Sequence, residues 1–269
     1  ARPLLLPGVR PLMAARAIWK ARLALGEADV PVKLYSAVEA RGVHFRLLDP
    51  KTLTPVSQRM VDPASGREVE TGRVERGYEV QSGLLVKLDD DELAALEPEP
   101  SREIELLAFV PDAAVDHRWY DRPYYLGPDG DDEAYFALAG ALTKEGRSGI
   151  ARWTMRGKRY VGALRAEGPY LVLITLRHAG EVVDASALPR PQASAPTKAE
   201  AKMAEQLVEM LRGPFEPERY RDEYRDRVLE LVEAKRAGKV VPMKRARPKR
   251  SDESLEKLLE RSLEQAGAA

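Results

Sequence analysis

Basic side chains gather in one stretch of this sequence, and their type indicates what they could bind. Residues 147–165 contain no acid, and their basic members are Arg147, Arg152, Arg156, Lys158, Arg159 and Arg165. Arginine suits phosphate because its planar guanidinium can donate two parallel hydrogen bonds to one group. The stretch therefore indicates a site for a nucleic acid or another polyanion.

The residues between these bases predict how they are presented. We expect a hairpin of two strands, 150–156 and 159–165, joined by a tight turn at Gly157-Lys158. Alternation on the first strand places Arg152 and Arg156 on one face and apolar side chains on the other. A solvated outer face of a sheet is the alternative. A solvated face usually mixes both signs of charge, whereas this one carries only positive charge.

The residues predicted to contact the nucleic acid or other polyanion follow from charge and alternation. They are Arg152, Arg156, Lys158 and Arg159, with Lys20, Lys33 and Arg46 of the basic amino-terminal strands as weaker candidates. Acids concentrate elsewhere, since residues 89–105 hold eight acids and one base. The four acids at 89–92 resemble a hard-cation site, but they are better explained as the start of a helix. We therefore expect separate acidic and basic surfaces.

Catalytic motifs are absent from the sequence. It has no phosphate-binding loop with a Gly-Lys-Ser/Thr ending, no Gly-x-Gly-x-x-Gly and no His-Glu-x-x-His. His44, His117 and His178 lie far apart, and there are no cysteines. We therefore predict no enzyme activity, no cofactor and no metal site. A hydrolase with a dispersed active site is a remote alternative.

Composition is that of a globular protein with balanced charge. The 269 residues are 44% apolar and 32% charged, with 43 basic and 43 acidic side chains. The lack of cysteine favours a reducing compartment. No apolar run approaches the roughly 18–20 residues that a membrane-spanning helix needs. We expect no membrane association, a cytoplasmic location and a disordered leader at residues 1–14.

The sequence up to about residue 184, which must position the basic side chains, consists mainly of predicted strands. Short runs rich in β-branched and aromatic residues alternate with Gly, Pro and Asp, and they include a candidate strand at 43–48. Two helices interrupt them, one beginning at 89–92 and one at about 132–145. Many strands with few helices predict a barrel or a sandwich over residues 15–184.

A helical region follows a Pro/Ala linker at 185–196. Thr197 and Glu200 form a capping-box pattern at the start of an arm that extends to residue 238. We expect its second helix to begin at Pro217. The apolar stripe of that helix is Tyr220, Tyr224, Val228 and Leu231. This stripe packs either on the chain's own barrel or on a second copy of the chain.

The tail divides by charge. Residues 239–250 carry six bases and no acid, which predicts a flexible segment with nonspecific phosphate contacts. Residues 251–269 fit an amphipathic helix whose apolar face is Leu255, Leu258, Leu259 and Leu263. A helix this short is marginal alone in water. We expect it to fold against a partner, with packing on its own core as the alternative.

Several segments, in order along the chain, resemble bacterial Ku proteins. They are Ala15-Arg-Ala-Ile-Trp-Lys20, Val30-Pro-Val-Lys-Leu-Tyr-Ser36, Val43-His-Phe-Arg-Leu-Leu48, Arg76-Gly-Tyr-Glu79, Phe109-Val-Pro111, Asp121-Arg-Pro-Tyr-Tyr-Leu126, Gly149-Ile-Ala-Arg152 and the run from Pro214 through Tyr224 to Lys235. Each segment alone is weakly diagnostic, and together they are specific. The resemblance covers about residues 15–238.

This resemblance implies a mixed, mainly β fold: a Ku-type β-barrel core with a strand bridge, followed by an α-helical dimerisation arm. It also implies a homodimeric ring that threads onto double-stranded DNA ends in non-homologous end joining. The ring would work at DNA breaks in the bacterial nucleoid and recruit a multifunctional ATP-dependent DNA ligase. Some relatives carry paired cysteines near residues 61–69, and this chain has none there.

The main alternative to this function is a barrel that binds RNA or single-stranded nucleic acid without catalysis. Such barrels present aromatic side chains on which bases stack. Only 6% of the residues here are aromatic, and alternation turns Trp153 away from Arg152 and Arg156. Both features disfavour stacking beside the basic face.

Overall fold

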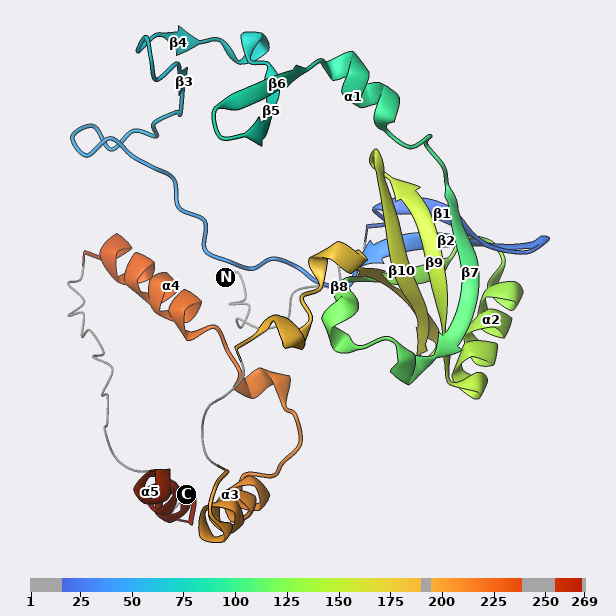
Figure 1. The fold of residues 1–269 in the computed structure, drawn as a ribbon, viewed down its shortest axis with the longest axis vertical. Coiled ribbons are helices and arrows are strands. Elements are labelled where there is room, and N and C mark those ends of the chain that lie inside the picture. The colour runs from blue at the N-terminus through green and yellow to red at the C-terminus, as the bar shows by residue number, and fades with distance from the viewer. Residues whose placement is uncertain (1–15, 190–194, 239–254, 268–269) are drawn as a thin grey trace, which may run out of the picture. The chain divides into compact units, whose positions relative to one another are not determined.

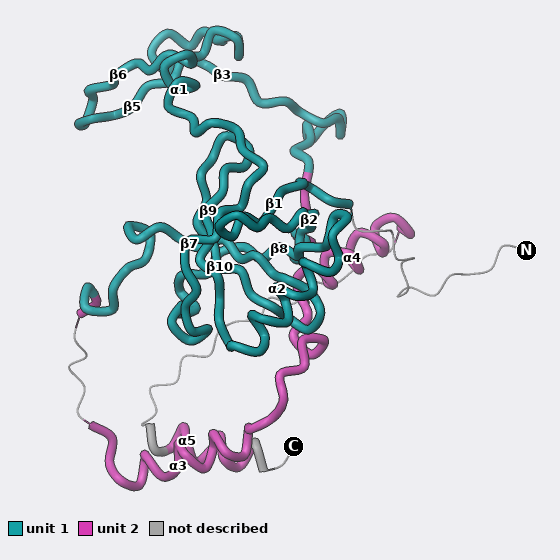
Figure 2. Tube along the Cα trace, turned by 90° about the vertical axis from the view of Figure 1, so that its right-hand side faces the viewer, with its two compact units in different colours: residues 1–40, 46–187 teal, residues 41–45, 188–269 magenta. Residues whose placement is uncertain are grey.

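The computed structural model describes residues 16–189, 195–238 and 255–267 (Figure 1). The predicted leader at 1–14 and the predicted basic segment at 239–250 lie outside these residues. The chain divides into two compact units, residues 1–40 with 46–187 and residues 41–45 with 188–269 (Figure 2). Among the described helices, none has both the length and the apolar character needed to cross a membrane.

Seven strands of the first unit form a closed barrel. In order around the barrel they are β1 (Trp19–Leu25), β2 (Ala28–Ser36), β8 (Tyr120–Pro128), β11 (Tyr170–Leu176), β10 (Lys158–Glu167), β9 (Arg147–Met155) and β7 (Glu103–Pro111). β1 and β7 pair in parallel and close the barrel, whereas the other neighbouring strands pair antiparallel. The predicted mainly β barrel is confirmed.

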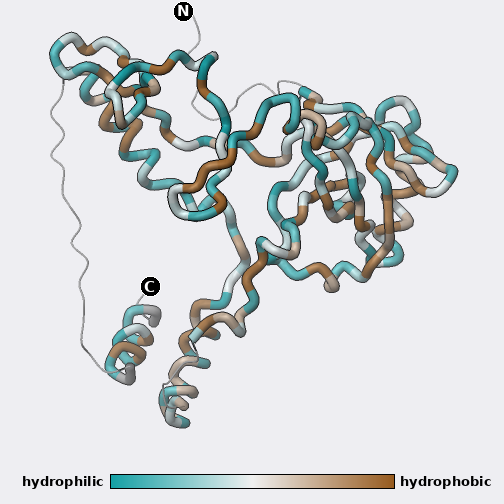
Figure 3. Tube along the Cα trace, turned by 45° about the horizontal axis from the view of Figure 1, so that its top comes forward, coloured by the Kyte–Doolittle hydropathy of each residue, from teal (hydrophilic) through white to brown (hydrophobic). Residues whose placement is uncertain are grey.

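Alternation of apolar and polar residues along these strands produces the core of the barrel. Leu23, Val32 and Leu34 are fully buried, while their neighbours along the chain are more exposed. Figure 3 shows hydrophobic and hydrophilic stretches interleaved along the chain. Inward side chains from neighbouring strands pack together because side chains directly opposite each other share a face.

Helix α2 (Asp132–Glu145) packs against the barrel and contributes to its core. It covers the predicted range of 132–145 and ends at Gly146, whose φ of +59° is the left-handed conformation that glycine adopts most easily. Tyr135 is fully buried, and burial raises the pKa of its hydroxyl. That hydroxyl donates to the carbonyl of Leu126 at 2.5 Å and accepts from the backbone N–H of Leu171 at 2.8 Å. One side chain thus links α2 to β8 and β11.

The segment from 37 to 102, which we call the bridge, connects β2 to β7. It contains β3 (Met60–Val61), β4 (Glu68–Val69), a 3-10 turn at Thr71–Arg73, β5 (Arg76–Gln81), β6 (Leu84–Leu88) and α1 (Asp90–Leu96). β3–β4 and β5–β6 are separate two-stranded sheets. None of residues 37–102 is buried. The predicted strand at 43–48 is wrong: only an isolated bridge between Leu48 and Pro55 forms there.

The acids at 89–92 begin helix α1, as predicted. Asp89 is the N-cap residue, and the Glu92 carboxylate accepts the backbone N–H of Asp89 at 3.0 Å. Asp90 and Asp91 lie in the first turn, where the helix dipole favours negative charge. Capping and the dipole therefore account for the residue types in this run.

The second unit contains α3 (Lys198–Met210), a 3-10 turn at Pro217–Arg219, α4 (Glu223–Arg236) and α5 (Leu255–Gly267). The capping box of α3 forms as predicted, with Thr197 and Glu200 each accepting the other's backbone N–H. The prediction that the next helix begins at Pro217 is wrong. Asp222 accepts the backbone N–H of Arg225 at 2.9 Å and caps α4, so the helix begins at Glu223. Tyr220 therefore precedes the helix that carries Tyr224.

Stability of the barrel should depend on Tyr135. Replacing it with phenylalanine leaves the Leu171 N–H and the Leu126 carbonyl without their shared partner in the core. We expect Tyr135→Phe to lower the free energy of unfolding by about 1–3 kcal/mol in urea denaturation. The control Tyr78→Phe changes an exposed ring on β5 and should shift stability by less than about 0.5 kcal/mol. Equal effects of the two variants would contradict this role of the hydroxyl.

Candidate nucleic-acid interface

The hairpin of β9 and β10 presents the predicted basic residues. Arg152 lies opposite Val161 and Thr154 lies opposite Arg159, so both arginines share the outer face of the barrel. Trp153 is 2% exposed and stacks on Tyr160 inside, with ring centroids 5.5 Å apart. The predicted separation of arginines from the indole ring is confirmed.

A glycine makes room for this indole ring. A Cβ atom at Gly162 would lie 2.7 Å from the ring of Trp153 and from the carbonyl oxygen of Ile174. Only glycine fits at this position without displacing a neighbour. The inner side of the hairpin is therefore tightly packed, and its outer side is left for charged residues.

The turn of the hairpin lies one residue earlier than predicted. Met155 pairs with Lys158, which leaves Arg156 and Gly157 as the turn, with φ values of +53° and +71°. Two positive φ values match the right-handed twist of the flanking strands. The prediction that Arg156 shares the face of Arg152 is therefore wrong. Arg156 is exposed at the tip, and Lys158 is exposed at the start of β10.

The outer face of the hairpin carries both signs of charge, which corrects the prediction of separate surfaces. β7 runs beside β9 and places Glu105 directly opposite Arg152. The Oε2 atom of Glu105 accepts from Nη2 of Arg152 at 2.7 Å and from its Nε at 3.2 Å. The two residues belong to segments far apart in the sequence, so local charge counting could not pair them.

A shallow cavity of about 310 Å³ lies over this part of the barrel. It is lined by Ser101, Glu103, Glu105, Arg152, Trp153, Thr154 and Arg159. Arg159, Arg156 and Lys158 form no ion pair with another described residue, whereas Arg152 is engaged by Glu105. Of the four hairpin residues predicted to contact a polyanion, Arg156, Lys158 and Arg159 are therefore free to meet a phosphate.

The weaker candidates lie in two different places. Lys20 and Lys33 face each other across β1 and β2. Both ammonium groups bind the carboxylate of Asp129, at 3.0 and 2.6 Å. Hydrogen bonds from Lys33 and Lys20 lower the pKa of Asp129, and the bond to Asp129 raises the pKa of Lys33. Arg46 is exposed and lies outside the helices and strands of the bridge.

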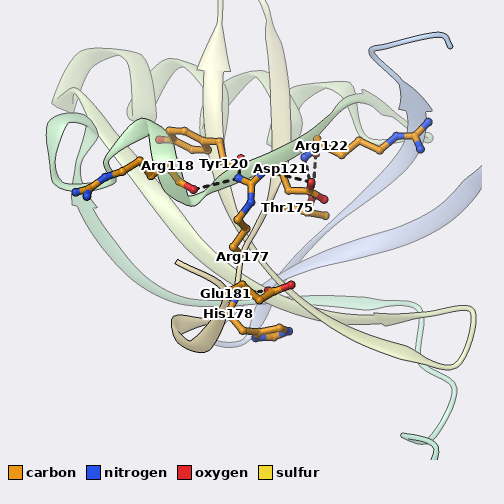
Figure 4. A network of polar contacts seen from close by, with 8 residues as sticks. All are labelled: Arg118, Tyr120, Asp121, Arg122, Thr175, Arg177, His178 and Glu181. Atoms are coloured by element: carbon orange, nitrogen blue, oxygen red, sulfur yellow. Dashed lines mark hydrogen bonds and ion pairs between the residues drawn. The ribbon is translucent and has the colours of Figure 1, made fainter. Parts of the chain in front are cut away.

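A network of polar residues that sequence reasoning missed ties β8 to β11 (Figure 4). The guanidinium of Arg177 donates to the carbonyl oxygens of Tyr120 and Arg118 and lies 3.7 Å from the carboxylate of Asp121. The hydroxyl oxygen of Thr175, which is buried, accepts the backbone N–H of Arg122 at 2.9 Å. The only feature of the sequence that pointed to this network was Arg177, which directly follows the strand that ends at Leu176. Through these contacts Arg177 links the end of β11 to the start of β8.

Large apolar side chains are exposed around the start of α4. Tyr220 is 71% exposed and Tyr224 is 67% exposed, while Val228 and Leu231 are half-buried. Tyr220 stacks on the exposed ring of Phe215, with centroids 5.5 Å apart. Exposed aromatic residues in a cluster are typical of protein–protein contacts.

The carboxy-terminal helix α5 packs beside α3 of the same chain. Leu258, Leu259 and Leu263 are half-buried on α5, and Met203 and Leu207 are half-buried on α3. The side chain of Leu255 lies outside the described residues. The helix predicted at 251–269 forms over Leu255–Gly267. It was expected to fold against a partner, with packing on its own core as the alternative, and in the structure it packs beside α3.

The family is decided by comparison with known proteins. A family model of the Ku70/Ku80 beta-barrel domain matches residues 24–207, from the end of β1 through the other six barrel strands and into α3. This chain belongs to the Ku family. The resemblance found in the sequence is thereby confirmed. The closed barrel of this Ku-family chain carries the basic hairpin, and the bridge leaves the barrel after β2.

Its Ku-family relatives match over most of their length. "Non-homologous end joining protein Ku 2" of Geotalea uraniireducens is 38% identical over 251 residues, which are 92% of this chain and 98% of the relative. "Non-homologous end joining protein Ku" of Anaeromyxobacter sp. is 38% identical, and the match covers 87% of this chain and 80% of the relative. The protein of that name from Mycobacterium tuberculosis is 36% identical, and the match covers 83% of this chain and 84% of the relative.

Proposed function

We propose that this Ku-family chain binds the ends of double-stranded DNA in double-strand break repair by non-homologous end joining. The observation that carries the proposal is the 38% identity to a relative named for this process, over 98% of that relative's length. The chain would work in the bacterial cytoplasm, at breaks in the nucleoid. Its affinity would come from phosphate contacts, which position a protein on DNA without reading sequence.

The packing of the aromatic residues argues against the alternative of a single-strand or RNA binder. Trp153 and Tyr160 stack on each other on the inner side of β9 and β10, and Trp153 is buried in the core. Neither ring therefore offers a stacking platform beside Arg152 and Arg159. A face that presents arginines beside no exposed aromatic ring fits the backbone of a duplex better than unpaired bases.

A homodimer is the form in which we propose the chain encircles DNA. The exposed Tyr220 and Tyr224, with the half-buried Val228 and Leu231, supply apolar surface for a second copy. Burying two large aromatic rings at an interface removes apolar area from water, which stabilises association. A ring closed by two copies could then enter a duplex only from an end.

We also propose that the carboxy-terminal helix recruits an ATP-dependent multifunctional DNA ligase. Leu258, Leu259 and Leu263 are only half-buried against α3, so part of this apolar face stays accessible. An amphipathic helix that presents leucines at this spacing suits a hydrophobic groove on a partner.

End dependence should be visible in competition experiments. A linear duplex should bind and compete, whereas a covalently closed circle of the same sequence should compete poorly because it offers no end. Affinity should fall steeply as salt rises from 50 to 200 mM, since phosphate binding releases counterions. Mobility shift with both forms and with single-stranded DNA measures this. Equal competition by circles would rule out threading.

Charge reversal should rank the bases of the hairpin. Arg156→Glu with Arg159→Glu should weaken duplex binding strongly, because neither base has an ion-pair partner among the described residues. As single neutralisations, Arg152→Gln should weaken it less than Arg159→Gln, since Glu105 already engages the Arg152 guanidinium. Lys144→Glu, which reverses a base at the end of α2, is the control and should bind as the wild type does. Normal binding by the double variant would remove the hairpin from the interface.

The dimer can be tested through its apolar residues. Tyr224→Asp with Leu231→Asp places two charges in the proposed interface, at a cost of several kcal/mol if these side chains become buried there. Analytical ultracentrifugation should then detect monomers, and binding to linear DNA should fall with dimerisation. The control Lys202→Asp changes an exposed polar position of α3. A double variant that remains dimeric would contradict an interface at α4.

Two truncations separate the proposed roles of the tail. A chain that ends at Arg250 keeps the basic segment and should bind DNA ends normally, but it should no longer stimulate the cognate ligase. A chain that ends at Gly238 should also lose DNA affinity, because six bases are removed. Nick-sealing and mobility-shift assays measure the two effects. Full stimulation by the chain ending at Arg250 would refute a ligase-docking role for α5.

A further inference from the structure

Three tyrosine rings surround a cavity on the outside of the barrel, away from the basic hairpin tip. The cavity measures about 450 Å³ and is lined by Tyr35, Tyr125, Leu126, Gly127, Glu167 and Tyr170. Tyr35 on β2 lies directly opposite Tyr125 on β8, and Glu167 lies opposite Tyr170 at the β10–β11 turn. Four adjacent barrel strands therefore build one site.

The tyrosine rings are accessible and held in place by the sheet. Tyr125 is 46% exposed and Tyr170 is 53% exposed, whereas the neighbouring Leu126 and Leu171 are fully buried. A Cβ atom at Gly127 would lie 3.1 Å from Cε2 of Tyr35. The absence of a side chain at Gly127 thus lets the Tyr35 ring lie close to the backbone of β8. This contact shapes one wall of the cavity.

The charge around the cavity favours a cation. Glu167 is the one charged residue in its lining, and its side chain has no ion-pair partner among the described residues. Lys33 lies opposite Gly127 on the neighbouring strand, but its ammonium group is held by Asp129 at 2.6 Å. The faces of aromatic rings are also electrostatically negative. A phosphate would meet a carboxylate here and no free base.

We propose that this cavity binds an arginine side chain presented by a peptide of a partner protein. A guanidinium can stack flat on tyrosine rings while it donates two hydrogen bonds to the Glu167 carboxylate. An ammonium group is compact and more strongly hydrated, so lysine would fit less well. The site binds protein rather than DNA, and it is independent of the proposed end binding.

The full-length chain labelled with 3-fluorotyrosine provides the test. The probe is N-acetyl-Gly-Arg-Gly-amide, and the matched control is the same peptide with citrulline, which keeps the shape of arginine and lacks its charge. Fluorine NMR should detect saturable shifts of Tyr35, Tyr125 and Tyr170, each assigned by a single Tyr→Phe variant. Tyr78, on β5, should not shift. The citrulline peptide should bind at least about threefold more weakly.

Variants of the cavity should change peptide binding and spare DNA binding. Glu167→Gln and Tyr125→Leu should each lower the affinity for the arginine peptide by about threefold or more. Glu145→Gln alters an exposed carboxylate at the end of α2 and should leave the peptide's affinity unchanged. Glu167→Gln should bind linear duplex as the wild type does, which separates this test from that of end binding.

Three results would overturn the proposal. Equal shifts with the arginine and citrulline peptides would show that charge is not recognised. Stronger shifts with deoxyadenosine than with the arginine peptide would make the cavity a nucleobase site. Tyrosine resonances that change on dilution, with no response to the peptide, would mean that a second copy of the chain covers it.

Discussion

The parallel pairing of β1 with β7 is the constraint on which the rest of the structure depends. Arg22 lies opposite Glu103 and Ala24 lies opposite Glu105 in this pairing, and the Arg22 N–H donates to the carbonyl of Arg102 at 2.8 Å. The β1–β7 pairing closes the barrel, so the barrel itself has no unpaired strand edge. Because β7 also pairs with β9, the chain that returns from the bridge is inserted between the amino-terminal strand and the basic hairpin.

That insertion decides the electrostatics of the candidate interface. β7 brings the alternating acids Glu103 and Glu105 to the face that Arg152 occupies, so one arginine is already neutralised before any partner arrives. Exposed ion pairs of this kind add little to stability. The pair fixes where the guanidinium lies, and of the predicted contact residues of the hairpin it leaves Arg156, Lys158 and Arg159 without an ion-pair partner among the described residues. Asp129 has a similar effect on Lys20 and Lys33.

Local patterns in the sequence predicted the elements whose residues interact with near neighbours. Alternation placed Trp153 inside and Arg152 outside, and Thr197 with Glu200 predicted the start of α3. Errors arose where two local solutions compete, as at Pro217, which opens only a 3-10 turn before Asp222 caps α4. The Arg152–Glu105 pair could not be predicted, since it depends on which strand lies beside β9. The tyrosine cavity could not be predicted for the same reason, since it depends on which strands lie side by side in the barrel.

The bridge has a consequence for how the length of this protein can vary. None of residues 37–102 is buried, and the barrel closes through β1 and β7 without their help. For such a connecting segment the entropy of closure grows only with the logarithm of length, so doubling it would cost about 0.6 kcal/mol. Insertions between β2 and β7 should therefore change the free energy of unfolding of the barrel very little. The length of the bridge can change over evolution while β2 and β7, the strands at its two ends, keep their register.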